Sequence, residues 1–503
     1  MAVSKGIISA FSALVIALIG LFTVNVGSAS AAMVFHSGFE GGSTFEWSTV
    51  TGSPQIQTSI KKTGTYALRC TPSTSPEYVD NRAASANRGT FYLYIAAAPS
   101  IETVICGRTS TSSIRLTATN YITLYDGSTL RGTSTTQLAT GTWYRVSFSR
   151  GPSNTGAAYI NGTQEISATT LVNAFSERLG VVSTGAATAD LYFDDAAFES
   201  TQAIADVGDI RTLLSLPNDA GNYTQFDTPT PNATHYLNVD DPPLSSFDTD
   251  YNRHAANSGN AYDTYNIQDA STIGIGANDT INAVHYWGRM RRGNGGGGSH
   301  HLAVRDNGSD YTTAVSATTS FAWYSRYDAT MPNGGGSWIQ ARLNSFEVGA
   351  YHGSGAQDTY ISAVMMMVAY TPEENISIPL PDSYDFGIVD ESSITATALT
   401  YFTVTNNSAD AVSISISGTD MSGGVTWTLS DTAAQGDDLY GLKAGLEGGD
   451  YTIIVKKTGP YNNLVTGLAA SASQRWGLQL LAPTYFSDGE TKSSTITLTA
   501  TYA

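Results

Sequence analysis

Short runs of alternating apolar and polar residues, separated by Gly, Asn and Ser, recur along almost the whole chain. Alternation with a period of two places successive side chains on opposite faces of a strand, so each run predicts a half-buried strand. A chain built from such strands can bury its apolar faces only by packing sheets together. The pattern therefore predicts an all-β protein. Examples are YALRC (66–70), YITLYD (121–126), WYRVSFSR (143–150) and VSISISG (412–418).

The length of 503 residues exceeds what a single β-sandwich needs, so several domains are expected. A hydrophobic content of 41% argues for packed cores rather than disorder. Strand-like runs and breaks divide the chain into a signal segment (1–32), a first sandwich (33–200), a second β-sandwich (205–371) and a last block (377–503). The closely spaced strands of the last block predict an immunoglobulin-like sandwich.

The N-terminus has the pattern of a secretory signal peptide. Lys5 precedes an apolar stretch over residues 6–26, and the small residues 29–32 follow as a cleavage site. We therefore expect a signal helix, removed on export, and a secreted or cell-surface protein. An uncleaved segment 6–26 acting as a membrane anchor is the alternative, because about 20 apolar residues can span a bilayer.

The chain is acidic, with a formal net charge of −18 from 43 acidic and 25 basic residues. Such a surface repels phosphate backbones, so nucleic acid is excluded as a general partner. The short basic run Arg289, Arg291 and Arg292 is too small to reverse this, and we expect a solvated strand end there.

Two cysteines, Cys70 and Cys106, each end a strand-like run in the first block. Export would permit a disulfide between them. Two buried free thiols are the alternative, and the sequence does not separate the two.

The order of motifs in the first block resembles the concanavalin A-like, laminin-G-like jelly rolls. The resemblance implies a jelly roll over residues 33–200, in a family that includes lectins, adhesion modules, glycanases and passive spacers. The later blocks resemble β-sandwich modules of bacterial surface or phage-like structural proteins. The motifs are FHSGFEG (35–41), TGTYALR (63–69), GTWYRVSF (141–148), AYINGTQEI (158–166) and ADLYFDDAAFE (189–199).

The same resemblance implies a calcium ion held by loop carboxylates, because hard oxygen ligands suit this cation. The candidate ligands are Asp126, Asp194 and Asp195. The alternatives are a turn cap at Asp126 and a surface acid at Asp195.

A carbohydrate site would need exposed aromatic rings beside polar side chains. Tyr92, Tyr94, Tyr121 and Tyr125 are the candidates, and alternation places Tyr92 and Tyr94 on one strand face. Core or cross-strand packing of these tyrosines is the alternative. Core packing is expected for the tryptophans in strong strand patterns, namely Trp143, Trp427 and Trp476.

Catalysis is not predicted. A glycanase on this fold needs two carboxylates on one strand face, about 5.5 Å apart. Glu40 and Glu46 are isolated in sequence, and adjacent Asp194 and Asp195 would face opposite ways on a regular strand. We expect a secreted binding or adhesion protein that contacts a carbohydrate or surface ligand. The alternative is a self-associating subunit of an extracellular filament, surface layer or virion appendage, and a secreted glycoside hydrolase ranks last.

Overall fold

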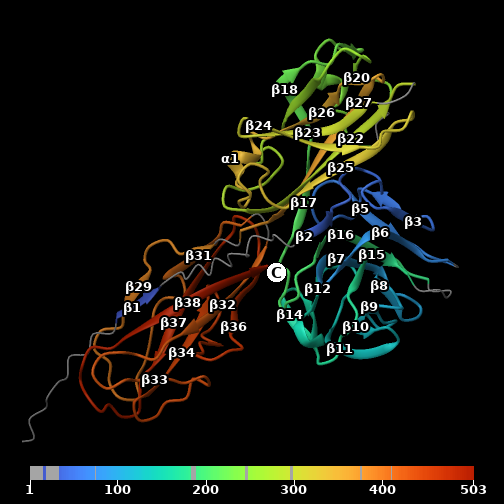
Figure 1. Cartoon of the computed structure of the whole chain (residues 1–503). Helices are drawn as coiled ribbons and strands as arrows, with labels where there is room; N and C mark the ends of the chain where they lie inside the picture. Colours follow the sequence, from blue (N-terminus) through green and yellow to red (C-terminus); the bar gives the residue numbers. More distant parts are fainter. Residues whose placement is uncertain are drawn as a thin grey trace, which may run out of the picture. The chain divides into compact units, whose positions relative to one another are not determined.

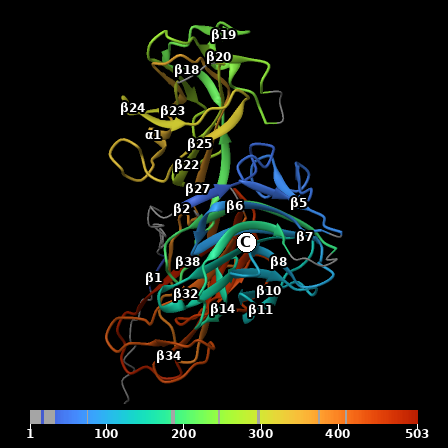
Figure 2. The ribbon, with the colours of Figure 1, turned by 45° about the vertical axis from the view of Figure 1, so that its right-hand side comes forward.

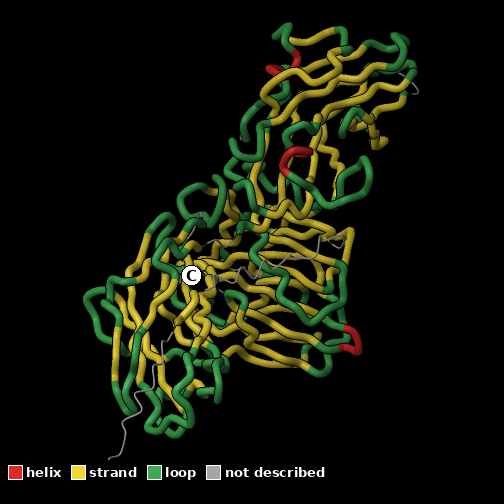
Figure 3. The backbone as a smooth tube through the Cα atoms, turned by 90° about the vertical axis from the view of Figure 1, so that its left-hand side faces the viewer, coloured by secondary structure: helices red, strands yellow, loops and turns green. Residues whose placement is uncertain are grey.

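The computed structural model describes residues 15–18, 33–73, 75–182, 188–243, 247–294, 298–373, 376–408 and 411–502. Strands dominate these residues, and the helical segments are single short turns (Figure 3). The all-β prediction is therefore confirmed. The chain forms two compact units, one of which is Val26–Pro372, while the other is built mainly on Glu373–Ala503.

The first sandwich of Val26–Pro372 consists of two sheets. An eight-stranded sheet has the order β14-β13-β12-β7-β16-β5-β4, with β2 also on β16, and a seven-stranded sheet has the order β11-β10-β9-β8-β15-β6-β3. The strands are β2 (Met33–Ser37), β3 (Thr49–Thr51), β4 (Gln55–Gln57), β5 (Ala67–Cys70), β6 (Glu77–Ala86), β7 (Arg88–Ala97), β8 (Thr103–Gly107), β9 (Ser112–Leu116), β10 (Tyr121–Asp126), β11 (Thr129–Gln137), β12 (Trp143–Arg150), β13 (Gly156–Ile160), β14 (Thr163–Ala168), β15 (Phe175–Val181) and β16 (Asp190–Glu199).

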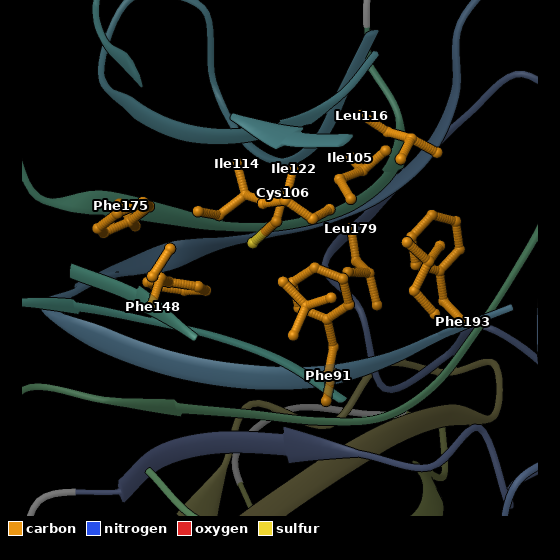
Figure 4. Close-up of a cluster of buried hydrophobic side chains, with 14 of the residues drawn as sticks. Phe91, Ile105, Cys106, Ile114, Leu116, Ile122, Phe148, Phe175, Leu179 and Phe193 are labelled. Atoms are coloured by element: carbon orange, nitrogen blue, oxygen red, sulfur yellow. The ribbon is translucent and has the colours of Figure 1, made fainter. Parts of the chain in front are cut away.

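The core of this sandwich lies between the two sheets (Figure 4). Phe91, Phe148 and Phe193 come from the eight-stranded sheet, and Ile114 and Phe175 come from the seven-stranded sheet. All five are fully buried. Burial of each such side chain contributes roughly 1.5–3 kcal/mol, which fixes the register of both sheets.

The second sandwich pairs a six-stranded sheet, β19-β20-β27-β22-β25 with β17 on β27, with a five-stranded sheet, β18-β21-β26-β23-β24. Long strands β22 and β27 form the centre of the first of these (Figure 1). The elements are β17 (Arg211–Ser215), β18 (Pro217–Thr224), β19 (Thr228–Thr230), β20 (Tyr251–His254), β21 (Ala261–Ile267), β22 (Thr280–Arg292), β23 (Ser299–Asp306), β24 (Ser309–Val315), β25 (Ala322–Asp328), α1 (Gln340–Leu343), β26 (Glu347–Gly353) and β27 (Thr359–Thr371).

The two sandwiches share a buried joint, where β2 lies beside β22 (Figures 1 and 2). A small apolar cluster joins Met33, Ala197, Ile210, Ala283 and Ala369 across it. Two buried imidazole rings lie in the same joint: the ring centroids of His36 and His285 are 5.9 Å apart. Burial lowers the pKa of His36 to about 3.

The second unit is also a sandwich of two sheets, with the orders β29-β1-β38-β32-β36 and β28-β31-β37-β34-β33. Trp427 and Trp476 are buried in its core, so their predicted core role is confirmed. Its strands are β28 (Ile376–Ser377), β29 (Ser383–Asp385), β30 (Ile394–Ala396), β31 (Phe402–Asn406), β32 (Val412–Gly418), β33 (Thr428–Leu429), β34 (Leu439–Leu446), β35 (Ile453–Ile454), β36 (Asn462–Leu468), β37 (Ser473–Leu481) and β38 (Ser493–Tyr502).

Of the predicted signal helix, only β1 (Val15–Leu18) falls within the described residues. There the chain is a strand instead, parallel to β38 and antiparallel to β29. The apolar, partly β-branched sequence VIAL suits this position between two strands. The remainder of the signal segment 1–32 lies outside the described residues. Among the described residues, no helix has the length and apolar character needed to span a membrane.

Candidate functional site

The outer face of the eight-stranded sheet carries aromatic side chains. On β7, Phe91 and Leu93 point into the core, so Tyr92 and Tyr94 point outward, as predicted from alternation. Tyr94 lies opposite Trp143 of β12 on one side and opposite Tyr192 of β16 on the other. Three neighbouring strands therefore place three rings side by side.

These three residues, Tyr94, Trp143 and Tyr192, form what we call the aromatic platform. The ring centroids of Tyr94 and Trp143 are 5.5 Å apart, and those of Tyr94 and Tyr192 are 5.7 Å apart, edge to face. Tyr94 and Trp143 are half-buried, whereas Tyr192 is buried. The platform thus presents an open apolar surface supported from the side by a third ring.

Polar groups lie beside the platform. Arg69 of β5 donates from Nε and Nη2 to the two carboxylate oxygens of Asp190, over 2.9 and 2.8 Å. Its guanidinium also covers the Tyr192 ring at 5.4 Å. Because the Arg69 side chain is 36% exposed, its remaining N–H groups can reach a ligand. The arrangement offers stacking and hydrogen bonding together, which is what recognition of a sugar requires.

Tyr92 does not belong to this surface, and its predicted ligand-binding role is a wrong prediction. The side chain is only 5% exposed, and its hydroxyl donates to Asp209 Oδ1 at 2.7 Å. The ammonium of Lys62 lies over the ring at 4.9 Å. The segment between the two sandwiches, which carries Asp209, occupies the space that a ligand would need.

Tyr121 and Tyr125 lie on β10 in the other sheet, so the fold does not bring them together with Tyr94. The guanidinium of Arg115 stacks on the Tyr125 ring at 3.5 Å, and the Tyr125 hydroxyl donates to Glu102 at 3.0 Å. Both tyrosines are half-buried. Their ligand-binding role remains a prediction.

The prediction that Trp143 packs in the core is wrong. Val146 and Phe148 of the same strand point inward, so odd-numbered Trp143 points outward. The alternation of WYRVSFSR contained this signal, because Trp143 is out of phase with the apolar pair.

The carboxylate of Asp126 is hydrogen-bonded by neighbouring residues of the protein. Its carboxylate accepts from the N–H of Val172 at 2.9 Å and from Asn173 Nδ2 at 2.6 Å, and it pairs with Arg131 at 3.1 Å. Burial alone would raise the pKa of Asp126, but these hydrogen bonds outweigh it and lower the pKa. This carboxylate holds loops together, a role close to the turn cap considered as the alternative. The fold does not place it near Asp194 and Asp195.

Four carboxylates meet beneath the loop at residues 62–66, and we call Glu40, Glu46, Asp194 and Asp195 the acidic cluster. All four are buried. Backbone N–H groups supply most of their hydrogen bonds: Thr65 and Tyr66 donate to Glu40, Lys62 and Thr63 to Asp194, and Thr212 to Asp195. None of the four forms an ion pair with a described basic side chain.

Burial is the largest influence on the protonation of this cluster. It raises the pKa of Glu40 to about 8 and that of Glu46 to about 7. Burial also raises the pKa values of Asp194 and Asp195. The negative charges of neighbouring acids raise both values further. The surface role considered for Asp195 is therefore wrong, since this side chain is 1% exposed.

The alternation pattern did not predict this cluster because the backbone of β16 is locally irregular. β16 contains a bulge after Asp194, and Asp195 adopts a positive φ of 48°. The strict alternation that would separate the two aspartates is broken there. Glu40 and Glu46 look isolated in sequence, although Glu40 lies within the FHSGFEG motif and reaches the cluster through the fold. A cleft of about 430 Å³ borders Glu40, Tyr66 and Leu213.

As the side chains stand, no group of three or more His, Cys, Asp or Glu among the described residues is arranged to hold a metal ion. Cys70 and Cys106 are both free and fully buried, so the second of the two alternatives is observed and the disulfide is not formed. They lie in opposite sheets of the first sandwich, Cys70 on β5 and Cys106 on β8. Burial raises the pKa of both thiols.

No known protein family matches the sequence, and no curated protein matches it. Among solved structures, the chain is similar to the Trypanosoma rangeli sialidase in complex with sialic acid, at 11% identity and a TM-score of 0.26. That match covers 35% of this chain and 31% of the sialidase. The chain spans between 27% and 31% of the length of this and four other structures of the Trypanosoma rangeli sialidase.

Two further structures are similar. Domain 4 of AbnA, a GH43 extracellular arabinanase from Geobacillus stearothermophilus, in complex with arabinotriose, has 17% identity and a TM-score of 0.25, over 34% of this chain and 97% of that one. The binding domain of Paraclostridial Mosquitocidal Protein 1 has 10% identity and a TM-score of 0.28, over 50% of this chain and 77% of that one. Similarities at this level carry no functional inference.

Proposed function

We propose that this protein is an exported, non-catalytic carbohydrate-binding protein and that the aromatic platform is its binding surface. The observation that carries the proposal is the pair of half-buried rings, Tyr94 and Trp143, beside the partly exposed Arg69–Asp190 pair. A pyranose ring can lie flat on Trp143 while its hydroxyls meet the guanidinium and carboxylate.

The hydrogen bonds made by the carboxyl groups with raised pKa values favour a binding role over hydrolysis. A raised pKa within a cleft is a typical mark of a general acid. In this protein, however, Glu40 is held by three hydrogen bonds from the backbone N–H groups of Thr65 and Tyr66. A carboxylate committed in this way stabilises a loop and is poorly placed to transfer a proton to a substrate.

The acidic cluster supports a calcium ion as a structural cofactor, which we include in the proposal. Glu46 Oε2 and Asp195 Oδ2 are buried without a well-formed hydrogen bond. Unpartnered carboxylate oxygens at low solvent exposure are costly unless the group is protonated or a cation is present. Asp194 and Asp195 would supply carboxylate oxygens to the ion, which would fix the loop at residues 62–66 through Asp194.

The proposal is tested by binding of the full-length protein to a glycan array, with Ca²⁺ and then with EDTA. We expect specific glycans to be bound, and Trp143→Ala to weaken that binding at least tenfold. Tyr78→Ala is the matched control, because it removes a half-buried tyrosine from the other sheet, one to which no binding role is assigned. Circular dichroism of each variant confirms that the fold is retained.

Two results would overturn the proposal. If Trp143→Ala leaves glycan binding unchanged, the platform is not the site. If the array stays blank and electron microscopy shows regular assemblies of the protein, the structural-subunit alternative is favoured. Calcium is tested separately by thermal unfolding, where a melting temperature that is the same in Ca²⁺ and EDTA contradicts the cofactor.

A further inference from the structure

The outer face of the six-stranded sheet in the second sandwich is divided into two halves. Along β22, Val284, Tyr286 and Met290 point into the core of their own sandwich. At one end, the outer face is covered by the first sandwich, with Ala283 in the shared apolar cluster. At the other end, the outward residues Arg289 and Arg291 are half-buried and lie beyond that cluster.

The open half is centred on Tyr360 of β27. Arg291 of β22 lies opposite Tyr360 on one side, and Arg253 of β20 lies opposite it on the other. The Arg291 guanidinium stacks on the Tyr360 ring at 3.5 Å and lies 5.0 Å from the centre of the Phe321 ring. Tyr251 meets Tyr360 edge-on at 5.3 Å. We call these five residues the arginine–tyrosine face.

Charge on this face is only partly compensated. Arg253 pairs with Asp358 at 3.0 Å, and Arg289 forms a two-point pair with Asp248 at 2.7 Å for each bond. Arg291 forms no ion pair with the described residues, and its one polar contact is a 3.5 Å approach to the carbonyl oxygen of Arg292. A guanidinium is therefore held flat on a tyrosine while most of its N–H groups are uncommitted.

The prediction of a solvated strand end at this basic run is wrong for Arg289 and Arg291. Both are half-buried, and both lie against aromatic rings, Arg289 at 5.8 Å from the centre of Trp323. Stacking fixes the orientation of a guanidinium and lowers the entropy lost when it binds a ligand.

We infer that the arginine–tyrosine face binds a saccharide that carries carboxylate groups, as a uronic-acid oligosaccharide does. The planar guanidinium of Arg291 matches a carboxylate in two-point geometry, and the tyrosine and phenylalanine rings offer stacking surfaces. The inference is independent of the aromatic platform, because it concerns another sheet and another ligand charge.

The number of uncommitted arginines distinguishes this ligand from a denser polyanion. A protein of net charge −18 repels nucleic acid, whose phosphates follow one another closely. One uncommitted arginine is enough for a single carboxylate per sugar ring, but it is not enough for a phosphate backbone. The expected ligand therefore carries no more than one carboxylate on each otherwise hydroxylated sugar ring.

The test is calorimetric titration of the full-length protein with an oligogalacturonate and with its methyl-esterified form, which removes only the charge. We expect the acid form to bind at least about tenfold more tightly, and its affinity to fall as salt is added. Equal affinity for the two forms overturns the inference, as does tighter binding of a single-stranded oligonucleotide of equal charge.

Three variants assign the binding to this face. Arg291→Gln should weaken binding of the acid form about tenfold, whereas Arg305→Gln should not. Arg305 is the matched control, since it also stacks on a tyrosine, at 5.2 Å from the centre of Tyr223, but lies in the five-stranded sheet. Equal loss in both variants contradicts the assignment.

Asp248→Asn gives a readout that misfolding cannot imitate. Asp248 is 44% exposed and occupies the N–H groups of Arg289, so neutralising it releases that guanidinium and removes a repelling charge. We expect Asp248→Asn to tighten binding of the acid form at least threefold and to leave the ester unchanged. Unchanged or weaker binding of the acid form overturns the inference.

Discussion

Replacing one carboxyl group of the acidic cluster by an amide should make the first sandwich more stable than in the wild type at high pH. Burial raises the pKa of Glu46 from 4.5 to about 7. Because the folded protein holds this proton more tightly than the unfolded chain, the stability that Glu46 contributes is fully present below pH 4.5 and is lost as the pH rises through 7. A difference of about two and a half pH units corresponds to about 3 kcal/mol.

Glu46→Gln is the appropriate change because it keeps the shape and removes the ionisation. Glu46 Oε1 accepts from the N–H of Gly41 at 3.4 Å, and an amide oxygen can do the same. The amide nitrogen would replace Oε2, which has no well-formed hydrogen bond. The variant should match the wild type near pH 4 and exceed its free energy of unfolding by about 3 kcal/mol near pH 8, with EDTA present.

Hydrogen exchange followed by mass spectrometry measures this locally, in peptides that contain Trp47 and β2. Comparing variant and wild type at each pH cancels the intrinsic exchange rates. Glu165→Gln is the control: burial tends to raise the pKa of Glu165, but hydrogen bonds from Thr135 and Thr136 lower it overall, so no gain should appear at high pH. A Glu46→Gln difference that stays constant from pH 4 to pH 8 would refute the reasoning.

Three further outcomes are expected. Phe91→Ala should lower the free energy of unfolding by about 3–5 kcal/mol in urea, and a loss below about 1 kcal/mol would contradict its place in the core. The lowered pKa of His36 means that its contribution to stability is present above pH 6.5 and is lost as the pH falls towards 3, so His36→Gln should lose less stability than the wild type on acidification; equal losses in thermal melts would contradict this. Cys70 and Cys106 should react with a thiol reagent only after unfolding, and rapid labelling of the native protein would contradict their burial.

The sequence predicted features that depend on local periodicity. Alternation identified the strands and placed Tyr92 and Tyr94 on one face, and it already contained the outward position of Trp143. What alternation cannot predict is which outward residue another segment covers. Tyr92 and Tyr94 are equivalent in sequence, yet only Tyr92 lies under the segment that carries Asp209.

The candidate sites depended on contacts between distant segments, and these were largely missed. Glu40 and Asp195 are far apart in the chain and meet because β2 pairs with β16. A bulge that places two adjacent aspartates in one buried cluster leaves no clear mark in the sequence. Arg291 was judged by its charge alone, whereas its structural role comes from stacking on Tyr360, a residue of the neighbouring strand.

The buried joint between the first two sandwiches has a consequence for how a polymer would be held. Met33, Ile210 and Ala369 fuse the two sandwiches through shared apolar contacts, so the aromatic platform and the arginine–tyrosine face keep a fixed distance from each other. A chain that is bound at one face meets the other at an effective concentration set by its own length and stiffness. Short oligosaccharides would occupy one face at a time, whereas a polymer whose neutral and acidic segments match the spacing would gain avidity without any new contact.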